Sequence, residues 1–141
     1  MSYLLDTCVI SELVRPLPDE KVVAWIGSCD EFDLFLSVMT IGEIQKGIEK
    51  VSPGKRKNRL SAWLKEELEI RFAERLLHVT DQVALTWGMM LGNAEKNGQP
   101  LSATDALIAA TAAAHDLVLV TRNIRDFEGC SIDIFNPWIT A

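Results

Sequence analysis

Residues 3–13 read YLLDTCVISEL, and this stretch decides the fold. Residues 3–5 are typical of a short buried strand, and residues 8–14 carry apolar side chains at helical spacing. Asp6 stands between the two segments. A carboxylate there either caps the helix that follows or helps to bind a cation. These two alternatives have to be separated by the rest of the chain.

The alternation of strand and helix continues along the chain. Further strands are expected at residues 34–38, 117–120 and 132–135. Further helices are expected to begin at residue 18 and to span residues 40–50, 55–77, 80–97 and 102–115. This order favours an α/β fold, a three-layer α/β/α sandwich with a mostly parallel central sheet. We expect residues 1–141 to form a single domain.

The composition is that of an ordinary globular protein, with 48% hydrophobic and 24% charged residues. No apolar stretch is long enough to cross a bilayer, and the N-terminus lacks the features of a signal peptide. We therefore expect a cytoplasmic protein without a membrane partner. The three cysteines are far apart and form no C-x-x-C pair, which argues against a zinc site or a disulfide framework.

The net charge of −6 weighs against broad electrostatic adhesion to nucleic acid. It leaves room for a nuclease, because a local basic patch can hold a backbone while clustered acids hold a metal. Basic residues gather between Lys50 and Arg59, and Arg122 and Arg125 lie closer to the acids discussed next. A solvated surface and a backbone-guiding patch are both open readings of these residues.

Three acids stand at the expected helix starts: Asp6, Glu43 and Asp105. Each has a structural explanation, because Thr40-x-x-Glu43 and Ser102-x-x-Asp105 match the capping-box pattern and Asp6 can cap a helix itself. In a parallel sheet, however, such helix starts gather at one edge. Three carboxylates at one edge repel each other, and a hard divalent cation such as Mg²⁺ or Mn²⁺ relieves that repulsion.

Four segments together resemble the PIN-domain ribonucleases, and more narrowly the VapC-type toxins of bacterial toxin–antitoxin pairs. They are YLLDTCVISEL, LSVMTIGEIQKGI, LSATDALIAATAAAHDLVLVTRN and the closing NPW. The closing segments are similar to the FitB-like branch. The resemblance implies a Mg²⁺- or Mn²⁺-dependent endoribonuclease that hydrolyses RNA phosphodiesters with a metal-activated water. It also implies that Asp6, Glu43 and Asp105 are catalytic and bind the metal.

The chain departs from the family pattern at one position. The family often carries a fourth acid shortly after the last strand motif, where this sequence has Asn123. Asparagine offers a carbonyl oxygen without charge, and Asp126 is the nearest acid that could replace it. Both residues remain candidates for completing the metal site.

The resemblance also implies partners: an RNA substrate, a cognate antitoxin protein, and either a homodimer or a toxin–antitoxin hetero-oligomer. Trp63 and Trp87 are candidates for such protein surfaces, and core packing is the alternative for both. Two rival functions remain. One is a non-catalytic or DNA-associated PIN-like binding or regulatory module, in which the acids are only caps. The other is a receiver-like phosphoacceptor domain, which normally has paired acids and a late lysine that this sequence lacks.

Overall fold

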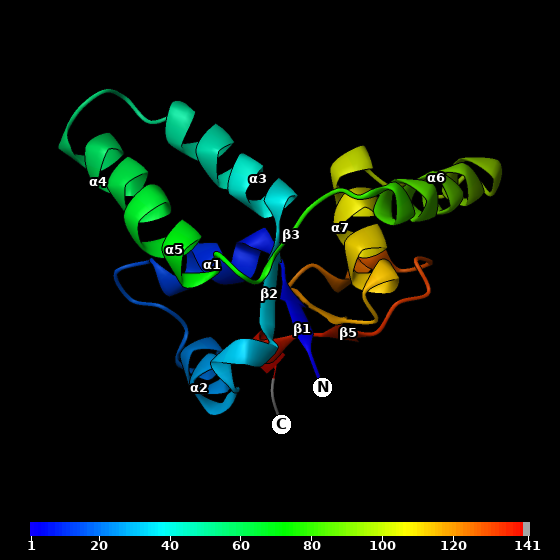
Figure 1. The fold of residues 1–141 in the computed structure, drawn as a ribbon, viewed down its shortest axis with the longest axis horizontal. Helices are drawn as coiled ribbons and strands as arrows, with labels where there is room; N and C mark the ends of the chain where they lie inside the picture. The colour runs from blue at the N-terminus through cyan, green and yellow to red at the C-terminus, as the bar shows by residue number, and fades with distance from the viewer. Residues whose placement is uncertain (140–141) are drawn as a thin grey trace.

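The structure, a computed structural model, describes residues 1–139, and a five-stranded parallel sheet lies at its centre (Figure 1). The strand order is β3-β2-β1-β4-β5, and every neighbouring pair is parallel. The strands are β1 (Tyr3–Leu5), β2 (Leu34–Ser37), β3 (Leu76–Leu77), β4 (Val118–Val120) and β5 (Ile134–Phe135). The parallel α/β/α sandwich expected from the sequence is confirmed.

Helices cover both faces of the sheet. One side carries α1 (Thr7–Leu13), α2 (Glu20–Ser28), α3 (Val38–Glu49), α4 (Lys55–Trp63), the π-helix η2 (Leu64–Leu68) and α5 (Glu69–Arg71). The other side carries α6 (Asp81–Lys96) and α7 (Ala103–Ala114), as Figure 1 shows. Short 3₁₀ turns are η1 (Glu31–Asp33), η3 (Ile124–Phe127) and η4 (Pro137–Ile139). Within residues 1–139, no helix is long and apolar enough to span a membrane.

The strands supply two hydrophobic cores because successive side chains point to opposite faces of the sheet. Leu5 packs into the core under α1, α2 and α3, whereas Leu4 packs into the core under α7. The strand β4 repeats this division with Val120 and Leu119. Continuous apolar strands of this kind are those of a sheet covered on both faces.

The central strand β1 is the point at which the chain changes its direction of winding. From β1 the chain moves to β2 and then β3 on one side, and it later returns to place β4 and β5 on the other side. In such sheets, ligands bind outside the carboxyl end of the strands at this switch point. Asp6 follows β1 directly and therefore stands at this position.

The expected single helix over residues 55–77 is wrong. The segment forms α4, η2 and α5, turns, and ends in the short strand β3 beside β2. The sequence concealed this change because apolar residues continue at four-residue intervals through Leu68, Phe72 and Leu76. The expected helix start at residue 40 is also wrong: α3 begins at Val38, and Ser37 caps it by accepting a hydrogen bond from the Met39 N–H.

A partly exposed cluster of charged side chains holds the end of α5 against the segment before β2. Nε and Nη2 of Arg71 donate to the Glu31 carboxylate, at 2.7 and 2.8 Å, and Arg75 adds a bond of 2.8 Å. Arg75 also donates to the carbonyl oxygens of Glu31 and Leu34. These bonds lower the pKa of Glu31 from 4.5 to about 2, chiefly through the hydrogen bonds of Arg71.

We predict that Glu31→Gln lowers the melting temperature at neutral pH. The Glu31 carboxylate is 41% exposed, so we expect a loss of about 1 kcal/mol in the free energy of unfolding. Because the pKa of Glu31 is depressed in the folded protein, its contribution is present above pH 4.5 and is lost as the pH falls toward about 2. Thermal melts of both proteins across this range measure the difference.

The control is Glu74→Gln, which removes an exposed acid next to the cluster that makes no ion pair among residues 1–139. It should leave the melting temperature within experimental error. A Glu31→Gln protein whose deficit stays constant down to pH 2 would contradict the assignment of the ion cluster.

Candidate active site

Asp6 is a buried carboxylate held by two hydrogen bonds at the carboxyl end of β1. It caps α1 by accepting from the Thr7 N–H at 2.8 Å through Oδ1. Its Oδ2 accepts from the hydroxyl of the fully buried Thr121 at 2.8 Å, just beyond the end of β4. The side chain is therefore held from the start of α1 and from the end of β4. The residue is only 5% exposed.

Glu43 lies in the second turn of α3 and reaches the same edge. The Thr7 hydroxyl donates to Glu43 Oε1 at 2.6 Å, and the Thr40 hydroxyl oxygen lies 3.3 Å from that of Thr7. Because α3 begins at Val38, Thr40 and Glu43 do not form the capping box that their spacing suggests. Glu43 is thus a site residue oriented by Thr7, and the helix start does not require its charge.

Asp105 enters the site from the first turn of α7, on the other side of the sheet. Here the cap expected from the sequence is confirmed, because Ser102 Oγ accepts from the Asp105 N–H at 3.1 Å. The carboxylate of Asp105 is half-buried. The Ser102 hydroxyl also forms a hydrogen bond with the Asp105 side chain that acts to lower the pKa of Asp105, so Ser102 orients this residue at the start of α7.

The carboxylates of this edge affect each other electrostatically. The pKa of Asp6 is raised, first by burial and then by the charges of Glu43 and Asp105. The pKa of Asp105 is also raised, first by burial and then by the charges of Asp126 and Glu43. Within the described chain, no lysine or arginine forms an ion pair with Asp6, Glu43 or Asp105. The edge thus gathers negative charge without compensation from the protein.

The gathered acids do not close into a complete metal-binding group. Among residues 1–139, no three His, Cys, Asp or Glu side chains lie close enough to hold an ion as they stand. The chemistry of the donors nevertheless fits a hard divalent cation, because they are carboxylate oxygens surrounded by hydroxyl groups. The structure thus brings Asp6, Glu43 and Asp105 into electrostatic reach of one another but leaves the site open.

The two candidates for a fourth ligand lie together after β4. Asn123 is exposed, and its N–H donates to Thr121 Oγ1 at 3.0 Å, so it belongs to the turn that also holds Asp6. Asp126 is exposed in η3 and contributes to the raised pKa of Asp105. Asp126 therefore adds charge near Asp105, while Asn123 lies next to the residue that binds Asp6.

Cys8 places a sulfur atom beside Asp6. Its Sγ lies 3.8 Å from Asp6 Oδ2 and 3.5 Å from Thr121 Oγ1. The pKa of this thiol is raised, first by burial and then by the charge of Asp6. Only a thiolate is a strong metal ligand, so Cys8 in its protonated form does not turn this group of oxygens into a soft-metal site.

Thr7 is the residue that the sequence analysis missed. Its N–H binds Asp6 and its hydroxyl binds Glu43, so a single residue links two of the three acids. Its position immediately after Asp6, at the first turn of a helix, was the available signal. Nothing in the sequence indicated that its hydroxyl would point at a residue 36 positions away.

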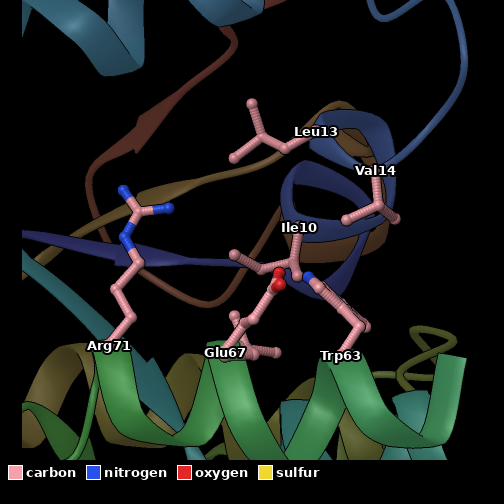
Figure 2. A pocket seen from close by; sticks show the side chains of 7 residues that line it. Ile10, Leu13, Val14, Trp63, Glu67 and Arg71 are labelled. Carbon is pink, nitrogen blue, oxygen red and sulfur yellow. The ribbon is translucent and has the colours of Figure 1, made fainter. Parts of the chain in front are cut away.

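A groove of about 430 Å³ with a mixed polar and apolar lining lies between α1 and the segment from α4 to α5, as Figure 2 shows. Its walls come from α1 with the residue after it, and from α4, η2 and α5; the lining residues are Ile10, Leu13, Val14, Trp63, Glu67, Leu68 and Arg71. Trp63 therefore contributes to a surface groove. Trp87 is half-buried on α6, where its indole N–H donates to the Ala103 carbonyl at 3.1 Å, which fixes α6 to α7.

Comparisons with known proteins show sequence relatives over nearly the whole chain. Residues 3–129 match the sequence profile of the PIN domain. The chain is 39% identical to Toxin FitB of Neisseria gonorrhoeae over 135 residues, which cover 96% of this chain and 97% of that protein. It is 35% identical to VapC ribonuclease Y4jK of Sinorhizobium fredii over 138 residues, which cover 98% and 99%.

Solved structures agree over the whole chain. The crystal structure of FitAcB from Neisseria gonorrhoeae contains a chain with a TM-score of 0.92 at 38% identity, covering 98% of this chain and 99% of that one. The structure of FitAB bound to the IR36 DNA fragment gives a TM-score of 0.91 at 37% identity, covering 99% and 97%. The profile matches most of the chain, and the relatives align nearly end to end. The chain therefore belongs to the PIN-domain family and is similar to the FitB and VapC toxins.

Proposed function

We propose that this protein is a metal-dependent endoribonuclease that acts as the toxin of a type II toxin–antitoxin pair. The observation that carries the proposal is the convergence of Asp6, Glu43 and Asp105, uncompensated by any ion pair among the described residues, at the switch point of the sheet. The names of the relatives, a toxin and a ribonuclease, support it.

The residues that would hold Mg²⁺ or Mn²⁺ are Asp6 and Asp105, with Glu43 as a further ligand and Asn123 or Asp126 completing the set. A bound divalent cation lowers the pKa of water and offsets negative charge on a phosphodiester. Thr7 and Thr121 keep the Asp6 carboxylate in one orientation, so its two oxygens are positioned before the substrate arrives. Thr7 does the same for Glu43, which orients the water that cleaves the RNA.

The proposal includes a cognate antitoxin as the protein partner. The protein then forms either a homodimer or a hetero-oligomer with that antitoxin. The solved relatives are named as two-component assemblies, FitAcB and FitAB. The groove beside α1 in Figure 2 offers such a partner the exposed Val14 and the partly exposed Leu13 and Trp63. The three cysteines are unpaired, as expected of a protein of the reducing cytoplasm, where its RNA substrates are found.

The first test is loss of RNA cleavage on neutralising either principal acid. We expect Asp6→Asn and Asp105→Asn to reduce Mn²⁺-stimulated cleavage at least about 100-fold, because each removes a carboxylate that would hold the cation which offsets charge in the transition state. Cleavage of total cellular RNA by the purified protein, resolved on a gel, measures the effect.

Asp81→Asn is the matched control, because Asp81 is also an acid in the first turn of its helix but lies on α6, outside the site. It should retain wild-type activity. A wild-type protein that cleaves no RNA with either metal would support the non-catalytic binding module instead, whereas a fully active Asp105→Asn protein would remove Asp105 from the catalytic residues.

A second prediction concerns stability and needs no activity. Without divalent cations, Asp105→Asn should raise the melting temperature at neutral pH, because it removes a half-buried charge repelled by its neighbours. Mg²⁺ or Mn²⁺ should raise the melting temperature of the wild type but not that of Asp105→Asn.

Thermal melts with EDTA and with each cation make this comparison. Asp81→Asn should instead lower the melting temperature slightly, because it loses about 0.3–1 kcal/mol of helix-dipole stabilisation in the free energy of unfolding. It should keep the response to cations. If Asp105→Asn behaves like Asp81→Asn, the Asp105 carboxylate serves only its helix.

A further inference from the structure

A second groove, which shares Val14 with the first, lies at the end of α1 that points away from Asp6. It has a volume of about 560 Å³ and is lined by Ser11, Val14, Arg15, Pro16, Arg56, Arg59 and Leu60. Three of these residues are arginines and none is acidic. A concentration of positive charge in a chain of net charge −6 is a local feature that the composition does not explain. We call this surface the arginine groove.

The helix α4, which forms one wall of the arginine groove, departs from ordinary helix electrostatics. It begins with the residues KRKNR, has no acid in its first turn, and has no side-chain cap. Cations at a helix N-terminus are destabilising because the helix dipole is positive there. Departures from a local rule are expected at functional sites, where another requirement outweighs stability. The charge of α4 therefore calls for an anionic partner.

The two arginines of α4 are free to bind such a partner. Within residues 1–139, neither Arg56 nor Arg59 forms an ion pair or a side-chain hydrogen bond, and both are exposed. Lys57 differs, because its ammonium group donates to the Glu49 carbonyl at 3.2 Å and so ties α4 to α3. The structural work at this end of α4 is thus done by Lys57, and not by the two arginines.

Arg15 continues the positive surface along α1 in a fixed position. It pairs with Glu12 at 3.2 Å, and Glu12 is itself buried and accepts from the Asp19 N–H at 2.9 Å. The side chain of Arg15 remains 62% exposed. The pair therefore anchors Arg15 at the mouth of the groove while leaving other guanidinium N–H groups open to solvent.

Arg122 has its backbone at the opposite end of α1, where the first turn of that helix begins. It directly follows Thr121, and its backbone N–H lies 3.5 Å from Cys8 Sγ in the first turn of α1. Its guanidinium group stacks over the ring of Trp138 at 5.6 Å, which limits its motion. Arginines thus stand at both ends of the helix that connects Asp6 to the arginine groove.

We propose that the arginine groove, together with Arg122, binds the phosphate backbone of the RNA substrate on one side of the bond that is cut. This inference rests on the proposed ribonuclease function. At a rise of about 1.5 Å per residue, the eight residues from Asp6 to Val14 span roughly 12 Å. That distance corresponds to about three phosphates of a strand with a rise of ~3.4 Å per nucleotide. Guanidinium groups suit this partner because their paired N–H groups match phosphate oxygens.

The test measures RNA binding without cleavage, by fluorescence anisotropy of a labelled oligouridine in EDTA over a range of KCl concentrations. Each phosphate contact to single-stranded RNA contributes about 0.7 to the slope of log affinity against log salt. At about 0.1 M salt we therefore expect Arg56→Gln and Arg59→Gln each to weaken binding roughly five-fold, and the double variant roughly 25-fold. The salt slope of the double variant should fall by about 1.4.

Lys96→Gln is the matched control, because it removes one positive charge at the end of α6, on the far side of the sheet from α4 (Figure 1). It should change affinity less than about two-fold, since charges beyond ~10 Å are screened at this salt concentration. Because Arg56 lies in the first turn of α4, Arg56→Gln should leave the melting temperature unchanged or higher. A lower melting temperature would assign the arginine a structural role and count against the proposal.

The outcomes separate this inference from the proposed function. If the wild type cleaves RNA but the double variant binds oligouridine with unchanged affinity and slope, the arginine groove is not an RNA surface and the nuclease stands. If the wild type cleaves nothing but the double variant still loses binding, the groove binds RNA and the nuclease is wrong. If polyglutamate binds the wild type more tightly than oligouridine does, and depends on the same two arginines, the groove belongs to an acidic polypeptide.

Discussion

The site depends on one buried carboxylate, that of Asp6, which is held in place although its charge is not neutralised by an ion pair within residues 1–139. Burying a charge without a partner is costly, and the cost is reduced here by hydrogen bonds from Thr7 and Thr121. Those two donors come from the start of α1 and the end of β4. The position of Asp6 thus fixes the relation between the central strands and the first helix.

The remaining acids are placed by elements from both faces of the sheet. Glu43 comes from α3 on one face and Asp105 from α7 on the other, and each is near enough to affect the pKa of Asp6. Only a parallel sheet with a switch point at its central strand brings helix starts from both faces to one edge. The fold therefore concentrates negative charge where an ordinary protein surface would disperse it, and the open geometry leaves room for an added cation.

Positive charge in this protein has two different uses. Arg71 and Arg75 both bind the Glu31 carboxylate. These bonds hold the segment between α5 and β3, where the apolar pattern had predicted a continuous helix. Arg56 and Arg59 have no such partner in the described chain and weaken the start of their own helix. The contrast indicates that arginine content alone is uninformative: Arg71 and Arg75 are bound to Glu31, whereas the guanidinium groups of Arg56 and Arg59 are available to a ligand.

The sequence by itself determined the α/β/α class and four of the five strands, because apolar runs are local patterns, and it predicted the three acids from their places near expected helix starts. It also identified the Ser102 cap correctly, since capping depends on residues three positions apart. The start of α3 is set by the local Ser37 cap. The two-residue strand β3 and the role of Thr7 were decided only by tertiary structure. Both depend on contacts between distant residues, such as Glu31 with Arg71 or Thr7 with Glu43, and no local pattern encodes which distant side chain will be met.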